Sequence, residues 1–194
     1  NQDENLFYQS LQDYKLLSEL VGASSFLRNR NVEALTKNLS ETTDTIIREI
    51  LAHLEKKLKV QLDILTLGKW ASRDMGLTSD LDFVFLSNEA PAEAHFKTAR
   101  RFINFLHSST GQTLYSIDLR LRPSGHAGPL MLTVEELTAY LKDKAQIWER
   151  QAYMSNRSLR EDRSLRLMEP RPLTEAQKTE LANIQSQLLT RVKD

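Results

Sequence analysis

The sequence predicts an α+β fold, in which a small mixed β-sheet bears three aspartates and helices lie before, across and after it. Apolar residues recur every three or four positions over 40–58 and 92–108, which indicates amphipathic helices. Between these helices, 59–67 and 80–86 are short apolar runs of the kind that form strands. A chain of 194 residues is long enough for one sizeable core with a helical appendage.

Composition excludes several classes of protein. The chain has 26 basic and 26 acidic residues and an isoelectric point near 7.1, so it is not expected to wrap nucleic acid or to lie on an acidic membrane. No apolar run approaches the roughly 18–20 residues of a membrane span, and no signal peptide is visible. Cysteine is absent, and the four histidines lack metal-ligand spacing. We expect a cytoplasmic protein with neither a nucleic-acid nor a membrane partner.

The N-terminal part of the chain is predicted to be helical. Residues 1–10 are similar to a viral protease site used in expression tags, so they are left out of the functional reasoning. The alternative is that they form the first turns of a helix. Two short helices are predicted at 11–22 and 24–39, with a break near Gly22.

The central region alternates helices and strands. The clearest helix, 40–58, would begin at Ser40 or Thr42, which are good N-cap residues. After the strand at 80–86, a polar break leads into the amphipathic helix at 92–108. A longer strand is predicted at 113–122, where one face is apolar and the other carries charge: Ile117, Leu119 and Leu121 against Asp118, Arg120 and Arg122.

The last part of the chain is predicted to be mostly helical. Thr133 and Glu136 have the spacing of a capping box. The five arginines between 157 and 171 are interpreted as a solvated linker rather than a binding patch. In chain order we expect a loop at 123–129, a strand at 130–133, helices at 134–145 and 146–160, a charged linker at 160–172, and a helix from Thr174 to about Val192.

Two aspartates at the start of the second strand are the candidate site. In a strand, Asp80 and Asp82 share one face with Val84, while the apolar residues between them face the other way. Neighbouring carboxylates repel each other unless a cation lies between them, and Mg²⁺ prefers carboxylate and phosphate oxygens. The alternative is a strand edge with two solvated aspartates.

A third aspartate favours the metal interpretation. Asp118 lies at the centre of an otherwise apolar strand, where an unpaired charge is costly. If the two strands are neighbours, three carboxylates converge and could hold two metal ions about 3.5–4 Å apart. Arg120 and Arg122, on the face of Asp118, could contact phosphate oxygens or simply neutralise the aspartates. Gly68 would let a phosphate approach the backbone, and Lys69 follows it.

These motifs resemble a known superfamily. Gly-Lys, Asp-x-Asp and a distant apolar-Asp-apolar resemble the DNA polymerase β-like nucleotidyltransferases and, more closely, the glutamine synthetase adenylyltransferase (glutamate–ammonia-ligase adenylyltransferase) family. The resemblance covers about 42–160. It rests on Leu67-Gly68-Lys69, on Ser79-Asp80-Leu81-Asp82, on Tyr115 to Leu130 with its Arg-Leu-Arg-Pro-Ser-Gly run, and on Trp148-Glu149-Arg150-Gln151-Ala152.

The resemblance implies a function. Full-length members carry two nucleotidyltransferase domains: one transfers AMP from ATP to a tyrosine of glutamine synthetase, and the other removes it by phosphorolysis. The quoted motifs look more like the C-terminal, adenylylating domain. The resemblance implies a helical lead-in at 1–41, a nucleotidyltransferase domain with the polymerase β-like fold at 42–132, and a helical C-terminal subdomain at 133–194. It implies Asp80, Asp82 and Asp118 as catalytic metal ligands, and Gly68, Lys69, Ser72, Ser79, Arg120 and Arg122 as nucleotide-binding residues.

The expected activity is therefore Mg²⁺-dependent transfer of AMP from ATP to a protein hydroxyl, with two Mg²⁺ ions and glutamine synthetase as the partner. Two alternatives stay open: phosphorolytic removal of AMP from the same target, and a nucleotide-binding regulatory module without turnover. The second is motivated by Ala71-Ser72, where the family usually has Gly-Gly. The family's Arg-Ala-Arg after Gln-Ala is also replaced here, by Ser155-Asn156-Arg157.

Overall fold

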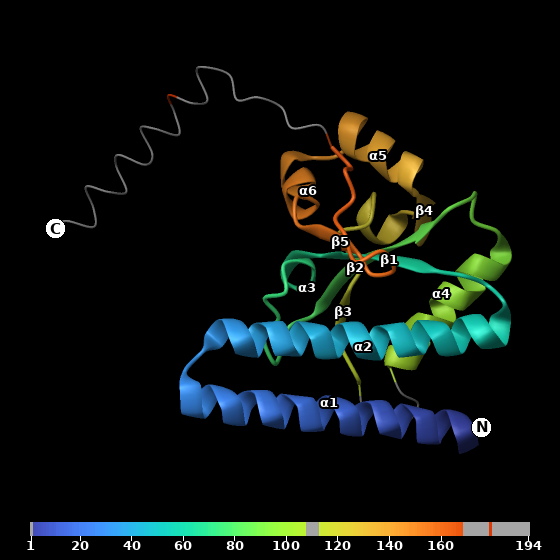
Figure 1. Ribbon diagram of the computed structural model, residues 1–194. Helices are drawn as coiled ribbons and strands as arrows, with labels where there is room; N and C mark the ends of the chain where they lie inside the picture. The colour runs from blue at the N-terminus through green and yellow to red at the C-terminus, as the bar shows by residue number, and fades with distance from the viewer. Residues whose placement is uncertain (1, 108–112, 169–178, 180–194) are drawn as a thin grey trace.

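The computed structural model describes residues 2–107, 113–168 and 179 (Figure 1). Two long helices, α1 (Gln2–Asn29) and α2 (Val32–Leu58), run antiparallel to each other along one side of a small sheet. Residues 2–10 are the first turns of α1, with Tyr8 buried, so their helical interpretation is confirmed. The helix expected from Thr174 lies outside the described residues. Among those described, none of the helices combines the length and the apolar character that crossing a membrane requires.

The expected break at Gly22 is wrong. Gly22 is a buried helical residue, and a Cβ on it would lie 2.8 Å from Asn38 Oδ1, so glycine here allows α1 and α2 to approach closely. The chain turns instead at Arg30, and Asn31 is the N-cap of α2, its side chain accepting from the amide of Ala34 at 2.9 Å. Ser40 therefore begins no helix; it lies inside α2 and donates to the carbonyl of Thr36.

The sheet is mixed, and its topology brings the two aspartate-bearing strands together. Its path is β3-β2-β1-β5, and β4 also pairs with β2. β1 is antiparallel to both β2 and β5, whereas β3 and β4 are parallel to β2. The strands are β1 (Asp63–Leu67), β2 (Leu81–Ser87), β3 (Ile117–Asp118), β4 (Met131–Thr133) and β5 (Asn156–Ser158).

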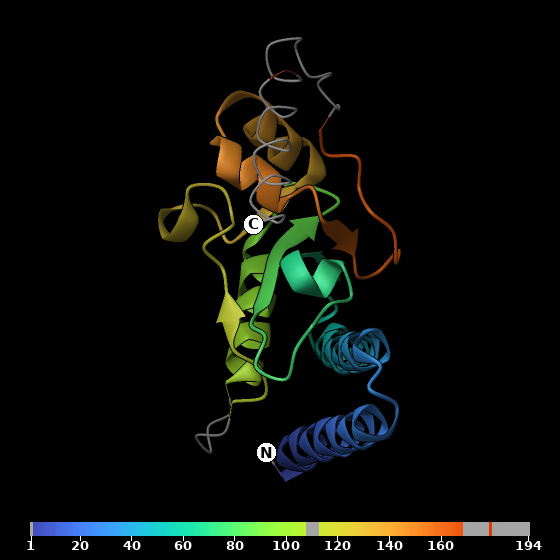
Figure 2. The ribbon, with the colours of Figure 1, turned by 90° about the vertical axis from the view of Figure 1, so that its left-hand side faces the viewer.

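Helices cover both faces of this sheet (Figure 2). The alternation predicted for β2 is confirmed: Phe83 and Phe85 meet Phe102 of α4 (Glu93–Leu106) in edge-to-face contacts, while Val84 belongs to the other core with Leu137 of α5 (Val134–Asp143). The α1–α2 pair lies beneath the first face, and α5 with α6 (Ile147–Ala152) lies above the second.

The capping box that begins α5 is also confirmed. The amide of Glu136 donates to Thr133 Oγ1 at 3.1 Å, and the amide of Thr133 donates to the Glu136 carboxylate at 2.8 Å.

Two further expectations are wrong. The strand predicted at 113–122 shrinks to β3, because the chain turns after Leu119, whose carbonyl accepts from the amide of Arg122. The helix predicted at 146–160 ends at Ala152, and β5 follows. The side chain of Asn156 donates to the carbonyl of Tyr153 just beyond that helix end, and β5 covers an edge of β1 that would otherwise carry unpaired backbone groups.

Candidate active site

The sheet register places two of the three predicted aspartates side by side. In the parallel ladder between β2 and β3, Asp82 is the partner of Asp118, so their Cα atoms lie on adjacent strands, which are about 4.8 Å apart in a sheet. Asp80 is exposed and directly precedes β2. The sequence-based condition that the two strands be neighbours is therefore confirmed, whereas the metal-binding role of the carboxylates stays a prediction.

Gly68 brings the backbone against Asp82. It follows β1 directly, begins the one-turn helix α3 (Gly68–Ala71), and has a φ of +53°, which an L side chain rarely adopts. A Cβ at this position would lie 2.8 Å from Asp82 Oδ2. The position therefore requires glycine twice over, for the left-handed backbone and for the close approach of a carboxylate.

For Lys69, Ser72 and Ser79, which follow Gly68, the expected nucleotide-binding role stays a prediction. Lys69 is exposed, but the hydroxyl of Ser72 faces back toward the chain, 3.2 Å from the carbonyl of Gly68. Ala71 lies in α3 and Ser72 has φ −79° and ψ −3°, a conformation open to any L residue, so replacing Gly-Gly here introduces no backbone strain. Ser79 accepts the amide of Gly76 at 2.8 Å, in a turn that ends just before Asp80.

Negative charge is concentrated at Asp82. Burial raises the pKa of Asp82 above its ordinary value, and the charges of Asp118 and Asp80 raise it further; Arg120 and Lys69 lower it by less. A bound cation would stabilise the ionised form of Asp82, which Arg120 and Lys69 compensate only in part.

Arg120 occupies the carboxylate of Asp118. Its Nε and Nη2 donate to Asp118 Oδ2 at 2.8 and 2.5 Å, and its amide donates to Oδ1 at 2.9 Å. This contact, with the charge of Asp118, raises the pKa of the Arg120 guanidinium, whose side chain is otherwise largely exposed. Arg120 therefore neutralises Asp118, which is one of the two roles considered from the sequence. The other role, contact with a phosphate oxygen, stays a prediction. Arg122 donates from Nε to the carbonyl of Gly125 at 2.7 Å and so braces the loop after β3.

The carboxylates are not gathered into a finished metal site. Within residues 2–107, 113–168 and 179, no group of three or more His, Asp or Glu side chains is arranged to hold a metal ion. The donor chemistry nevertheless fits a hard divalent cation, because Asp82 and Asp118 are paired across the ladder and the negative charge at Asp82 is undercompensated. Binding such a cation between them would require Asp118 to exchange its contact with Arg120.

The Trp-Glu-Arg-Gln-Ala motif supports the loop that follows Asp118. Glu149 is buried and accepts a hydrogen bond from the Tyr140 hydroxyl at 2.6 Å, and this hydroxyl in turn accepts the amide of Ser124 at 3.3 Å. Tyr153 donates to the carbonyl of Leu121 at 2.7 Å. The motif therefore ties the loop to α5 and α6. The tryptophan of the motif, Trp148, is 58% exposed.

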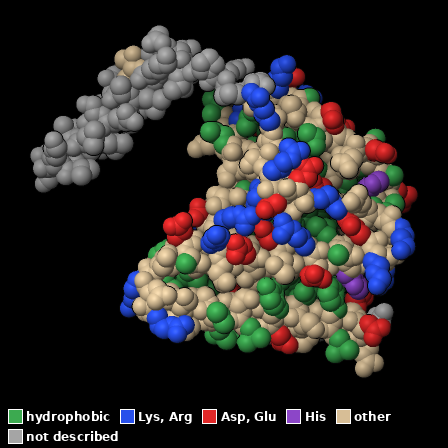
Figure 3. Space-filling view, in the orientation of Figure 1, with side chains coloured by type: hydrophobic (Ala, Val, Ile, Leu, Met, Phe, Trp, Pro, Cys, Tyr) green, Lys and Arg blue, Asp and Glu red, His purple; other side chains and the backbone are tan. Residues whose placement is uncertain are grey.

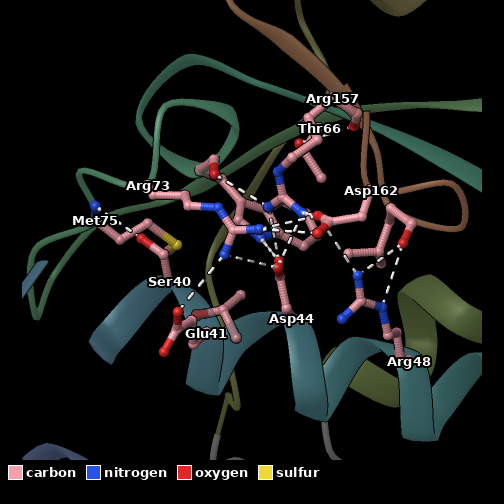
Figure 4. Close-up of polar contacts among 12 residues, drawn as sticks. Ser40, Glu41, Asp44, Arg48, Thr66, Arg73, Met75, Arg157 and Asp162 are labelled. Carbon is pink, nitrogen blue, oxygen red and sulfur yellow. Dashed lines mark hydrogen bonds and ion pairs between the residues drawn. The ribbon is translucent and has the colours of Figure 1, made fainter. Parts of the chain in front are cut away.

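Sequence reasoning missed a buried ion pair between α2 and β5. Arg157, predicted to lie in a solvated linker, is buried, and its guanidinium forms two hydrogen bonds to the buried carboxylate of Asp44, at 2.8 and 2.9 Å (Figure 4). A signal was present in the sequence, because Asp44 lies three residues before Ile47 and seven before Leu51, on the apolar stripe of its helix.

Comparison with known proteins gives a consistent family. A profile of the glutamate-ammonia ligase adenylyltransferase family matches residues 2–171. A protein of Neisseria meningitidis named bifunctional glutamine synthetase adenylyltransferase/adenylyl-removing enzyme is 37% identical over 131 residues, which is 62% of this chain and 15% of the relative. Proteins with the same name from Nitrosomonas europaea and Burkholderia mallei are 34% and 33% identical and match 68% and 71% of this chain. In these two the match spans 15% and 16% of the relative's length.

Proposed function

The chain belongs to the glutamate-ammonia ligase adenylyltransferase family, and from this premise we propose that it catalyses Mg²⁺-dependent transfer of AMP from ATP to a tyrosine hydroxyl of glutamine synthetase. The observation that carries the proposal is the pairing of Asp82 with Asp118, with the backbone of Gly68 against the Asp82 carboxylate. The relatives' name includes glutamine synthetase and adenylyl transfer, which supports this target and this reaction.

The proposal includes the finer fold. A mixed sheet whose parallel pair carries Asp82 and Asp118, entered from a glycine at the end of β1, is what the DNA polymerase β-like nucleotidyltransferase fold would require. Residues 42–132 would form the nucleotidyltransferase unit and 133–194 its helical C-terminal part. β5 returns from this later part to pair with β1, which supports a single working unit.

Asp80, Asp82 and Asp118 would hold the Mg²⁺ ions. Bound there, Mg²⁺ would neutralise phosphate charge, lower the pKa of the attacking hydroxyl and stabilise the departing pyrophosphate. The residues of this chain would do the rest. The exposed ammonium of Lys69 would face the triphosphate beside Gly68, whose backbone lies against the Asp82 carboxylate. Arg120, released from Asp118, would contact a phosphate oxygen.

The reaction balances with one proton transferred. The hydroxyl oxygen of the substrate forms a bond to the α-phosphorus, the α–β phosphoanhydride bond breaks, and pyrophosphate leaves with those bonding electrons. The hydroxyl proton passes to Asp118. Phosphorolytic removal of AMP would use the same residues with phosphate as the attacking group, releasing ADP and the free hydroxyl. The relatives' name includes adenylyl removal, so this direction is the second candidate.

The test is incubation with ATP labelled at the α-phosphate, Mg²⁺ and glutamine synthetase. We expect label on the synthetase with the native chain and with Asp143→Asn, a control at an exposed carboxylate that ends α5. We expect none with Asp82→Asn. Release of ADP from the adenylylated synthetase on adding phosphate would favour removal as the activity. Metal-dependent ATP binding without either reaction would favour a regulatory module, and a chain that binds no ATP would refute the site.

A further inference from the structure

A buried polar junction lies directly beneath the candidate nucleotide site. Asp44 of α2 accepts three hydrogen bonds: Trp70 Nε1 and Arg157 Nη2 both donate to Oδ1 at 2.8 Å, and Arg157 Nη1 donates to Oδ2 at 2.9 Å. The side chains of Asp44 and Arg157 are only 3% and 7% exposed. The carboxylate of Asp44 therefore joins α3 and β5 to α2.

Trp70 connects this junction to the site. It directly follows Lys69 in α3, is fully buried, and its backbone carbonyl accepts from Arg157 Nη2 at 3.4 Å. Its ring meets Phe83 edge to face, at 6.1 Å between centroids, and Phe83 directly follows Asp82. Movement of Trp70 would therefore displace both the Gly68-Lys69 segment and the strand that carries Asp82.

The rest of the loop before β2 is fastened to the same helix and to the segment after β5. Arg73 donates to Asp162 at 2.9 Å, and Asp162 also accepts from Arg157 at 2.9 Å. The amide of Met75 donates to Ser40 Oγ at 3.3 Å. Figure 4 shows these groups converging between α2 and the strands, and Figure 3 shows acidic and basic side chains side by side on the surface above α2.

A buried ion pair is a poor means of gaining stability, because removing both charges from water offsets much of their attraction. Burial lowers the pKa of Arg157, but the hydrogen bonds and charges of Asp44 and Asp162 outweigh it, so the net shift is upward and the guanidinium stays charged. What the pair adds is geometry, because a guanidinium and a carboxylate meet in a fixed bidentate arrangement. The group so fixed is Trp70.

We propose that Asp44 and Arg157 are positioning residues that hold Trp70, and through it the Gly68-Lys69 segment, in the place where the triphosphate is bound. The inference rests on the proposed nucleotide site. Neither residue touches substrate. Loss of either residue should weaken nucleotide binding more than a substitution elsewhere that destabilises the fold by the same amount. The reason is that a displacement of about 1 Å in a positioned group can reduce function by about 100-fold.

The first measurement is made without metal or nucleotide. The chain has two tryptophans, so Trp148→Phe leaves the indole of Trp70 as the single indole N–H signal in a proton–nitrogen spectrum. In that background we expect Asp44→Asn to move this signal and to accelerate hydrogen exchange at the amides of Ser72 and Asp74, which bond to the carbonyls of Gly68 and Lys69, by at least about tenfold.

Arg48→Met is the matched control. Arg48 lies one turn after Asp44 on α2, donates to the carbonyl of Leu159 at 3.0 and 3.2 Å, and lies 3.8 Å from Asp162. Its loss therefore also weakens the link between α2 and the segment after β5, but it leaves the hydrogen bonds of Asp44 to Trp70 and Arg157 in place. Trp70→Phe removes the indole N–H that donates to Asp44, together with part of the buried ring, and leaves both Asp44 and Arg157 in place. If Asp44→Asn fails to fold, the positioning role is tested with Trp70→Phe, by hydrogen exchange at the amides of Ser72 and Asp74 and by nucleotide binding.

The second measurement is the Kd for Mg²⁺ with a non-hydrolysable ATP analogue. We expect the Kd to rise at least about tenfold in Asp44→Asn and in Trp70→Phe, and to stay within about twofold in Arg48→Met. If the parent protein binds the analogue and all three variants bind it equally well, the positioning role is wrong and the proposed function stands. If the parent protein binds none, the proposed function fails, and this inference fails with it.

Discussion

Gly68→Ala tests whether the close approach of the backbone to Asp82 is real. At a φ of +53° an alanine is strained by roughly 1–2 kcal/mol relative to glycine. Its Cβ would also lie 2.8 Å from Asp82 Oδ2, closer than carbon and oxygen approach without a shift. Because the carboxylate can rotate away, we expect the fold to survive and the carboxylate to be displaced from its partner, Asp118.

The magnitude can be measured by urea unfolding and thermal melting. A loss of 1–2 kcal/mol corresponds to a midpoint roughly 2–8 °C lower for a chain of this size. Gly76→Ala is the matched control, since that glycine has no left-handed φ and a Cβ would meet only Ser79 Oγ, at an ordinary 3.6 Å. We expect Gly68→Ala to lose metal-dependent nucleotide binding and Gly76→Ala to keep it. Equal stability of the two variants would refute the backbone argument, and unchanged nucleotide binding in Gly68→Ala would refute the site.

Three further predictions follow from the contacts. Asp82→Asn should raise the urea midpoint while abolishing transfer, because it removes a partly buried charge that its neighbours repel; a lower midpoint would show that the carboxylate is already compensated. Tyr140→Phe should cost about 1–3 kcal/mol in urea unfolding, because it leaves a buried oxygen of Glu149 without its 2.6 Å donor, and a neutral result would mean that water replaces the hydroxyl. The bond from Lys57 lowers the pKa of Glu4, so its stabilising effect is complete above about pH 4.3 and is lost as the pH falls through the lowered folded-state value. Glu4→Gln should therefore remove less than about 1 kcal/mol at pH 7 and nothing at pH 2, and an equal loss at both would contradict the ionic origin.

The sequence predicts those parts of the fold that local patterns determine. The strand β2 shows its alternation in the residues themselves, and Thr133 with Glu136 forms the capping box that their spacing indicates. Gly22 misleads because the reason for a glycine there is not local: it lies where another helix passes. β5 was missed for a similar cause. Three residues are too few to show a period, and their strand conformation depends on pairing with the edge of β1, since Arg157 pairs with Thr66, 91 residues away in sequence.

The candidate site divides in the same way. The pairing of Asp82 with Asp118 could be expected from the sequence, because both lie in apolar strands, where an uncompensated carboxylate is energetically costly. Ser72 could not be placed, since a serine hydroxyl has equally good partners in a phosphate and in the carbonyl one turn back, and the structure has the second. The role of Arg157 could not be predicted because its partner is 113 residues away and the arginines that follow it, Arg160, Arg163 and Arg166, are exposed.

The functional argument rests on a contrast between two carboxylates, the buried Asp44 and the half-buried Asp82. Asp44 accepts two hydrogen bonds from the guanidinium of Arg157 and one from Trp70, so the protein itself neutralises this carboxylate. Among the described residues, Asp82 has no comparable partner: burial and two like charges raise its pKa, and the nearby cations offset them only in part. An arginine could compensate Asp82 in the same way as Arg157 compensates Asp44. The undercompensated charge of Asp82, beside a glycine that no side chain can replace without strain, is the physical reason for proposing that a divalent cation binds there.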